Sequence, residues 1–494
     1  MQTPTPTPTP TLRNLIGGSW APSSSGATLD VWDPSTAEVL AAVPLSGPED
    51  VDRAVARAAE AAARWRDEPV PRRARLMFRL HTLIERHAEE LARLIVLENG
   101  KGIEEARGEI QRGLEVVEFA AGAPTLLMGE GLEQVATGVD TDLYRHPLGV
   151  AVGITPFNFP AMIPLWMAPL AIVCGNAFIL KPSQRTPQTA GRLAELFLEA
   201  GTPDGVVSVV HGAGETAELL IEHPGVAAVS VVGSAAIARR VYAMAAAAGK
   251  RVQALAGAKN HIVVMPDADL DLAAEAILSS AFSNGGQRCL AASVAVVIDE
   301  VADALVERIA RLAGAAPIGS GLDPENVVTP LTTEEHRGRV AAWIETGLGE
   351  GARMVLDGRG RGPSRGFFLG PTILDDVQPE MSVAQEEIFG PVLLVHRVPT
   401  LERAIAAVNG SRYGNAAAIF TPDGGAARRF RREADAGMIG VNIGVPAPMA
   451  FFPFAGWKGS FFGDLHATGK DAINFYTERK VIVSRWPDRP EAGP

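Results

Sequence analysis

Apolar positions in the first part of the chain recur at helical spacing. Between Pro48 and Asn99 small apolar and aromatic side chains return every three or four residues. The pair Asn99-Gly100 then supplies a typical helix stop. A second stretch of the same period runs from Glu104 to Ala121. We therefore predict a set of amphipathic helices in this region.

From residue 150 onward, short apolar runs alternate with helical stretches, which is typical of βαβ units around a parallel sheet. The first series predicts strands and helices at Val150–Ile154, Ala177–Leu180, Leu193–Ala200, Val206–Val210, Ala227–Val232 and Ala235–Ala248. The second predicts them at His261–Met265, Leu270–Ser283, Ser293–Ile298, Val301–Leu312, Val392–Val395, Thr400–Asn409, Ala416–Phe420, Gly425–Asp435 and Ile439–Asn442. The fold class is therefore α/β, with two doubly wound parallel-sheet domains.

The uncharged stretch Gly149–Leu180 is long enough to cross a bilayer. Its four prolines would each remove a helical hydrogen bond, and Asn158 and Asn176 add polar groups that lipid cannot satisfy. We interpret the stretch as a buried strand, an irregular loop, a helix and a second buried strand.

The two ends of the chain differ from the rest in pattern. Alternating Thr and Pro from Met1 to Thr11 predict a disordered leader over residues 1–12, without the features of a targeting segment. Near the other end, Lys480–Arg485 alternates like a strand but has no obvious local partner. It could lie at the edge of its own domain or pair with another subunit.

Charge and cysteine content narrow the function. The 494 residues include 45 Lys and Arg against 57 Asp and Glu, a net charge of -12, which argues against nucleic-acid and anionic-membrane partners. Cys174 and Cys289 are the only cysteines, too few for a disulfide framework. We therefore expect a reducing, cytoplasmic location.

Cys289 lies in a polar, glycine-rich segment, Asn284-Gly-Gly-Gln-Arg-Cys289. The cation of Arg288 directly precedes it, so we predict a lowered pKa and a nucleophilic thiolate. The alternative is a small buried hydrophobic residue, an interpretation that suits Cys174 among its apolar neighbours.

Other residues suit the chemistry that a nucleophilic thiol needs. Asn158, in a proline-rich loop after an apolar strand, could donate to an oxyanion, or simply form a turn. Lys181 follows a strand, and Gly233-Ser234 leads into a helix whose N-terminus could bind a pyrophosphate. Taken singly, these residues could also be helix caps or surface charges.

Five segments, in this order and spacing, resemble the aldehyde dehydrogenase superfamily: Ile154-Thr-Pro-Phe-Asn-Phe-Pro160, Lys181-Pro-Ser, Val231-Val-Gly-Ser234, Gly285-Gly-Gln-Arg-Cys289 and Glu386-Glu-Ile-Phe-Gly-Pro391. The resemblance implies a Rossmann-like NAD-binding domain over 13–122 and 143–253 and a catalytic domain over 254–455. It also implies a β-strand oligomerisation arm with the C-terminal tail, over 123–142 and 456–494. The strand Lys480–Arg485 would then cross to a partner subunit in a homodimer or homotetramer.

The resemblance also implies roles for single residues. Cys289 is the expected nucleophile and Asn158 the oxyanion donor, with no metal. Gln184 stands where NAD-dependent members place a glutamate, so NADP is possible beside NAD. The residues expected to bind the cofactor are Thr155, Pro156, Phe157, Lys181, Ser183, Gln184, Gly233, Ser234, Glu387 and Phe389.

Within the superfamily, the segment Ala258-Lys-Asn-His261 resembles the CoA-acylating methylmalonate-semialdehyde dehydrogenase branch. In hydrolytic members a glutamate activates water, and we assign Ala254 to that position, which favours coenzyme A as the acyl acceptor. The branch implies NAD-dependent oxidation of malonate or methylmalonate semialdehyde to acetyl-CoA or propionyl-CoA with release of CO2. Arg112 and Arg288 would bind the substrate carboxylate. The alternatives are a hydrolytic NAD(P)-dependent enzyme and a catalytically silent protein of the same fold.

Overall fold

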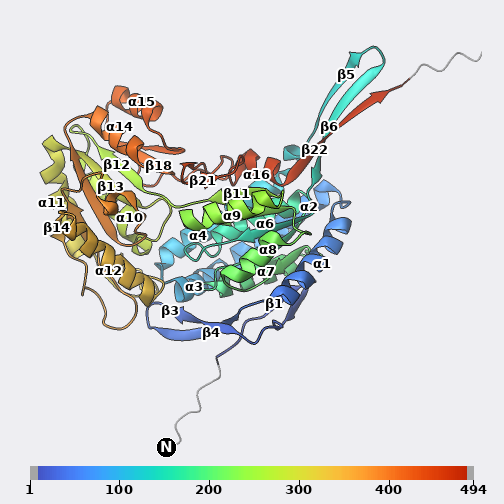
Figure 1. Cartoon of the computed structure of the whole chain (residues 1–494), viewed down its shortest axis with the longest axis horizontal. Coiled ribbons are helices and arrows are strands. Elements are labelled where there is room, and N and C mark those ends of the chain that lie inside the picture. Colours follow the sequence, from blue (N-terminus) through green and yellow to red (C-terminus); the bar gives the residue numbers. More distant parts are fainter. Residues whose placement is uncertain (1–8, 487–494) are drawn as a thin grey trace, which may run out of the picture.

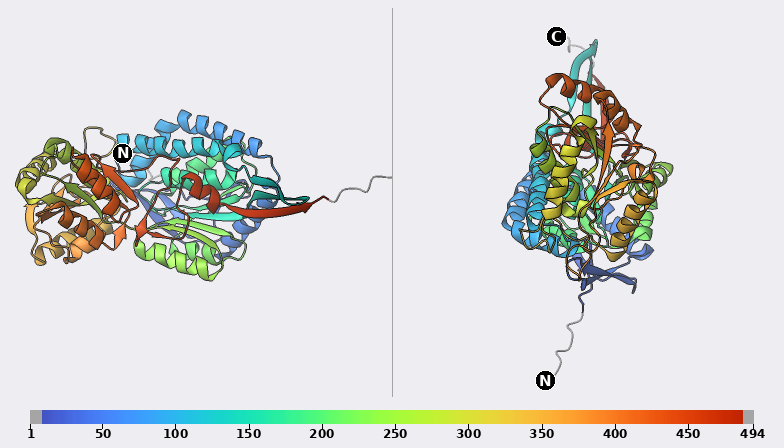
Figure 2. Two further views of the ribbon diagram at one scale, coloured as in Figure 1. Left: turned by 90° about the horizontal axis from the view of Figure 1, so that it is seen from above. Right: turned by 90° about the vertical axis from the view of Figure 1, so that its left-hand side faces the viewer.

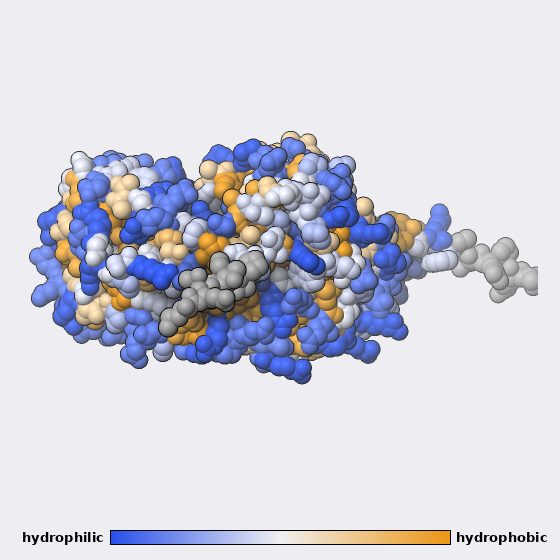
Figure 3. Space-filling view, turned by 90° about the horizontal axis from the view of Figure 1, so that it is seen from below, coloured by the Kyte–Doolittle hydropathy of each residue, from blue (hydrophilic) through white to orange (hydrophobic). Residues whose placement is uncertain are grey.

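Residues 9–486 are described by a computed structural model, which contains two α/β lobes and a projecting arm (Figure 1). Each lobe is built around a sheet whose central strands are parallel, as the alternating pattern predicts. The arm leaves the first lobe on the side away from the second lobe (Figure 2). Polar residues cover most of the face seen from below, and apolar residues lie in scattered groups on it (Figure 3).

The first lobe contains an eight-stranded sheet in the order β2-β1-β9-β8-β7-β10-β11-β21. Its strands are β1 (Asn14–Ile16), β2 (Ser19–Ala21), β7 (Val150–Ile154), β8 (Ala177–Lys181), β9 (Val207–Val209), β10 (Ala228–Val232), β11 (Arg251–Leu255) and β21 (Phe461–Phe462). The helices of this part of the chain are α1 (Pro48–Trp65), α2 (Val70–Arg86), α3 (Ala88–Asn99), α4 (Ile103–Ala121), α5 (Ala123–Leu126), α6 (Met162–Val173), α7 (Pro187–Glu199), α8 (Gly214–Glu222) and α9 (Ala235–Ala247). A separate hairpin joins β3 (Thr28–Asp33) and β4 (Glu38–Pro44).

The second lobe contains a seven-stranded sheet in the order β14-β15-β16-β13-β12-β18-β19. Its strands are β12 (Asn260–Val264), β13 (Ala292–Ile298), β14 (Arg353–Leu356), β15 (Thr372–Asp375), β16 (Val392–Val398), β18 (Ala416–Phe420) and β19 (Met438–Val441). Its helices are α10 (Leu270–Phe282), α11 (Asp299–Ala315), α12 (Glu334–Gly349), α13 (Ser382–Gln385), α14 (Leu401–Gly410) and α15 (Gly424–Glu433), with a short 3-10 turn, η1 (Ser283–Gly286). A small ribbon pairs β17 (Tyr413–Gly414) with β20 (Trp457–Lys458).

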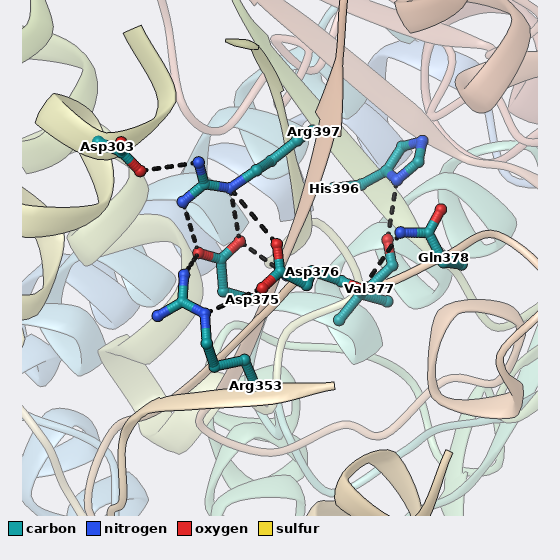
Figure 4. A network of polar contacts seen from close by, with 8 residues as sticks. All are labelled: Asp303, Arg353, Asp375, Asp376, Val377, Gln378, His396 and Arg397. Atoms are coloured by element: carbon teal, nitrogen blue, oxygen red, sulfur yellow. Dashed lines mark hydrogen bonds and ion pairs between the residues drawn. The ribbon is translucent and has the colours of Figure 1, made fainter. Parts of the chain in front are cut away.

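A buried carboxylate stabilises the edge of this second sheet. Asp375, at the end of β15, accepts two hydrogen bonds from Arg397, at 2.7 and 3.1 Å, and is also paired with Arg353 (Figure 4). Its side chain is fully buried, so the two guanidinium groups offset the cost of removing the charge from water. The network holds β14, β15 and β16 together.

The arm is a three-stranded antiparallel sheet of β5 (Glu130–Ala136), β6 (Val139–Pro147) and β22 (Thr477–Arg485), and α16 (Gly469–Phe475) precedes its last strand. The strand that lacked an obvious local partner in the sequence pairs with β6 of its own chain along its whole length. Because β6 continues to Pro147, it crosses the domain boundary expected at 142–143. Pairing with another subunit stays a prediction, and the arm exposes apolar side chains that would suit it, among them Leu132, Tyr144, Val481 and Val483.

Two regions of unusual composition have simple structures. The uncharged stretch from residue 149 forms β7, an irregular loop, the twelve-residue helix α6 and β8, as expected. Within residues 9–486, no helix combines the length and the apolarity needed to span a bilayer. The prediction of disorder over residues 1–12 is wrong at the end of that range, because Pro10 and Leu12 exchange backbone hydrogen bonds with Ala42. Residues 1–8 of that leader lie outside the described part.

Candidate active site

Three segments predicted to bind a cofactor lie side by side at the carboxyl ends of parallel strands. Strand β7 pairs with β8, where Ile154 is opposite Lys181, and with β10, where Ile154 is opposite Val231. The loops that follow these strands therefore converge. They carry the expected residues Thr155, Pro156, Phe157 and Asn158; Lys181, Ser183 and Gln184; and Gly233 and Ser234.

Lys181 and the start of α9 suit a dinucleotide. The ammonium group of Lys181 is almost fully buried, and burial is the one effect that lowers its pKa, to about 8. A charge in that position needs hydrogen-bond acceptors, which ribose hydroxyls would supply. Gly233 and Ser234 directly precede α9, where backbone N–H groups can bind phosphate. These residues fit NAD, although their individual roles stay predictions.

The second lobe contributes Glu387 and Phe389, which lie opposite the first lobe's loops. The Glu387 carboxylate accepts a hydrogen bond of 3.0 Å from the Ala258 amide, and burial raises its pKa to about 7. Phe389 has a left-handed backbone (φ 59°), and its ring packs edge-on against Phe157 with the ring centres 5.9 Å apart. The two predicted groups of cofactor residues thus meet across the junction of the lobes.

Cys289 follows a strained turn that fixes its backbone. Asn284 and Gly286 have left-handed φ angles of 51° and 70°, and a Cβ at Gly286 would lie 2.2 Å from the Gly390 carbonyl oxygen. The Cys289 carbonyl accepts hydrogen bonds from Asn260 and Asn415, at 2.9 and 3.0 Å. The sequence pattern did not single out these two asparagines, although an amide at the start of a buried apolar strand is a usable signal.

Asn158 is directed at the nucleophile's turn, as its predicted role requires. Its side-chain amide donates a hydrogen bond of 2.9 Å to the Gln287 carbonyl, two residues before Cys289. A carboxamide nitrogen carries two hydrogens, so one remains to donate to an oxyanion. The structure therefore brings Asn158 to the turn that directly precedes Cys289, and the catalytic roles of the two residues stay predictions.

The structure overturns the prediction that the pKa of Cys289 is lowered. Although the residue is partly exposed, its thiol is enclosed, and burial raises its pKa to about 12. The Glu387 carboxylate raises it further, and this outweighs the opposing effect of Arg288. Arg288 has only a small effect on the Cys289 pKa, because its guanidinium is directed at the carbonyls of Ser279 and Ser280, to which it donates hydrogen bonds.

We expect alkylation of Cys289 in the protein without added cofactor to be slow at neutral pH. Since the reactive thiolate forms only as pH approaches the raised pKa, the iodoacetamide rate should rise about tenfold per pH unit between roughly pH 7 and 9. Glu387→Gln should raise the rate at each pH, because it removes a negative charge, and Cys289→Ala should abolish labelling. A plateau below about pH 8 would show that Arg288 dominates instead.

The predicted carboxylate ligands, Arg112 and Arg288, face different surroundings. Arg288 lines a narrow cavity with Glu387 and lies 3.6 Å from the Glu105 carboxylate. Arg112 pairs with Glu115 at 2.9 Å and donates to the Pro448 carbonyl at 2.5 Å. Joint binding of one carboxylate by both arginines stays a prediction, and it requires their side chains to leave these partners.

The assignment of Ala254 to the position of the hydrolytic base stays a prediction, and the structure shows how its side chain packs. Ala254 packs in the apolar cluster under α9, together with Val231 and Val241. Side chains alternate between the faces of a strand, and the next residue, Leu255, belongs to the cluster against which Cys289 packs. Leu255 therefore lies on the other face of β11 from Ala254, and neither residue has a carboxylate.

Comparison with known proteins agrees with this geometry. The model of the aldehyde dehydrogenase family matches residues 20–482. Malonate-semialdehyde dehydrogenase 1 of Geobacillus kaustophilus is 57% identical over 477 residues, which cover 96% of this chain and 98% of that protein. The crystal structure of methylmalonate-semialdehyde dehydrogenase from Oceanimonas doudoroffii has a TM-score of 0.95 and 46% identity, and covers 97% of this chain and 99% of its own. A Sinorhizobium meliloti structure assigned to the same activity, complexed with NAD, has a TM-score of 0.96 and 43% identity, and covers 98% of this chain and 99% of its own.

Proposed function

The chain belongs to the aldehyde dehydrogenase family, and we propose that it oxidises malonate or methylmalonate semialdehyde with NAD and transfers the acyl group to coenzyme A. The β-carboxylate would leave as CO2, which gives acetyl-CoA or propionyl-CoA. Relatives above 50% identity that are named for this aldehyde class support the proposal.

In the first half-reaction, the Cys289 thiolate attacks the aldehyde carbon and forms a thiohemiacetal. Asn158 and the Cys289 amide would donate to the resulting oxyanion, and the hydrogen bond from Asn158 to the Gln287 carbonyl supports this role for Asn158. NAD, when bound, accepts the hydride from the thiohemiacetal carbon, and a thioester remains on Cys289. Lys181, Gly233 and Ser234 would bind the adenosine ribose and pyrophosphate, with Glu387 and Phe389 at the nicotinamide end.

The absence of a carboxylate at both Ala254 and Leu255 supports the proposal for the second half-reaction. Without a carboxylate at either position, neither of these β11 residues can act as a base for water near the thioester. A thiol needs less help than water because its pKa lies closer to neutral pH. Coenzyme A is therefore the favoured acyl acceptor. It would act after the β-carboxylate has left as CO2 and the carbanion that this leaves beside the thioester has been protonated.

The hydrolytic alternative would need another base, and Glu387 is the carboxylate whose charge acts on the Cys289 thiol. Its pKa of about 7 suits a general base. However, its carboxylate is engaged by the Ala258 amide, and the resemblance assigns it to the nicotinamide ribose. The hydrolytic reaction is therefore the less favoured candidate.

The same proposal covers the choice of cofactor, the oligomeric state and the location of the protein. Gln184 lacks the negative charge that would repel a 2′-phosphate, so NADP is a possible second cofactor beside NAD. The exposed apolar side chains of the arm favour a homo-oligomer, either a dimer or a tetramer. The scarcity of cysteine favours a cytoplasmic location.

The test is steady-state NADH formation from malonate semialdehyde with and without coenzyme A. With coenzyme A we expect sustained turnover and acetyl-CoA as product. Without it we expect a burst of about one NADH per active site and then slow turnover. Equal steady-state rates in both conditions, with a free acid as product, would establish the hydrolytic alternative.

A further inference from the structure

The end of α3 and the turn that follows it, residues 98–101, contact the predicted oxyanion loop and the start of α6, residues 157–162, through side chains. Asn99 donates a hydrogen bond of 3.0 Å to the Phe157 carbonyl, and Lys101 donates one of 2.7 Å to the Asn158 carbonyl. The Lys101 ammonium also lies 4.0 Å from the centre of the Phe159 ring. Three consecutive residues of the loop are thus contacted from one turn.

The charge of Lys101 is balanced by Glu109 of α4, whose carboxylate also holds the far end of the same loop. The two side chains are 2.7 Å apart and 1% and 0% exposed. The second carboxylate oxygen of Glu109 accepts from the backbone amides of Ala161 and Met162, at 2.7 and 3.0 Å, at the start of α6. One ion pair therefore fixes both sides of the loop that presents Asn158.

Stability alone does not account for such a pair. Burying two charges costs about as much as their attraction returns, and apolar residues of similar volume often stabilise a core as well. What the pair does supply is a fixed direction for the backbone at Asn158, through strong charge-assisted hydrogen bonds. The same turn also contacts the part of the first lobe that is predicted to bind the cofactor. There the Glu98 carboxylate accepts hydrogen bonds from the backbone amides of Gln188 and Thr189, at the start of α7.

We propose that Lys101 and Glu109, together with Asn99, are positioning residues for the oxyanion donor Asn158. The role assigned to them needs no contact with substrate or cofactor, because they act by fixing the peptide groups on either side of Asn158. A displacement of about 1 Å at a catalytic donor can cost on the order of a hundredfold in rate, so the pair affects the chemical step. This inference rests on the oxyanion role proposed for Asn158, but not on the identity of the aldehyde or of the acyl acceptor.

The test is the single-turnover rate of NADH formation from propanal and NAD, which does not depend on coenzyme A. The double variant Lys101→Met/Glu109→Gln leaves no unpaired buried charge but loses the hydrogen bond to the Asn158 carbonyl. We expect its rate to fall at least about tenfold, with little change in the Kd of NAD. Asn99→Ala keeps the ion pair and loses the bond to Phe157, so a smaller fall is expected, and it provides the test if the double variant does not fold.

Each variant is also made together with Asn158→Ala. If the turn acts through Asn158, its substitution has little further effect in that background, a non-additivity that a general loss of stability would not produce. Lys470→Met, at an exposed lysine, is the matched control and should leave the rate unchanged. An equal fall in both backgrounds, an unchanged rate in the variants, or an unchanged rate in Asn158→Ala alone would each overturn the proposal. A loss of coenzyme A dependence in steady state would instead overturn the proposed function.

Discussion

Cys289→Ala is expected to reduce aldehyde-dependent NADH formation by at least about 10⁴-fold, with NAD binding retained. The reason is chemical, because hydride transfer requires the tetrahedral thiohemiacetal, and an alanine side chain cannot form it. The backbone should be unaffected, since the Cys289 carbonyl is held by Asn260 and Asn415 whatever the side chain. The measurements are the single-turnover rate of NADH formation and the Kd of NAD.

Cys174→Ala is the matched control for this substitution. Cys174 is buried in the apolar core of the first lobe, and burial raises the pKa of its thiol to about 12. The control should lose a little stability through a small cavity, and it should keep its activity. Full activity in Cys289→Ala, or inactivity in the Cys174 control with an unchanged melting temperature, would contradict the assignment of the nucleophile.

Much of the fold follows from the sequence because its signals are local. The apolar runs predicted as strands include Val150–Ile154 and Ala416–Phe420, and both have those bounds in the structure. Such strands are buried on both faces, so they are apolar throughout and have clear ends. The pairing of β22 with β6 could not be found in this way, because the two strands are more than 300 residues apart in the chain.

The candidate site likewise combines residues that the sequence predicts with features that only the fold reveals. Cys289 and Asn158 could be proposed from residue type and neighbours, and the structure brings Asn158 to the turn that precedes Cys289. The raised pKa of Cys289 could not be predicted from the sequence. It depends on where the Arg288 guanidinium points and on the charge of Glu387, a residue distant in sequence. The amides of Asn260 and Asn415 are likewise connected to Cys289 only by the fold.

Ala254 and Leu255 show how a shift of one residue along a strand changes a functional argument. In a strand, adjacent residues face opposite sides of the sheet, so an alignment shifted by one residue exchanges the core side with the active-site side. Ala254 joins the apolar cluster under α9, and Leu255 joins the cluster on the opposite face of β11, which Cys289 also contacts. The argument for an acyl acceptor other than water holds for either position, because neither residue has a carboxylate.

Leu255→Glu should raise NADH turnover in the absence of coenzyme A by roughly a hundredfold, with the free acid as product. The substitution adds a carboxylate to the cluster that contains Cys289, where it can take a proton from water that attacks the thioester. Burial should place its pKa near neutrality, as it does for Glu387, whose pKa is about 7, so it would act as a base at and above neutral pH. Steady-state NADH formation and product analysis without coenzyme A measure the effect.

Ala254→Glu is the matched control, because it adds the same group one residue earlier in the same strand. Its carboxylate would enter the apolar cluster under α9, where it has no access to the thioester and where an unpaired charge is costly. We therefore expect a lower melting temperature and no gain in hydrolysis. Hydrolysis gained in Ala254→Glu but not in Leu255→Glu would reverse the orientation of β11 inferred here. A gain in neither would mean that access of water, rather than the missing base, limits hydrolysis of the Cys289 thioester.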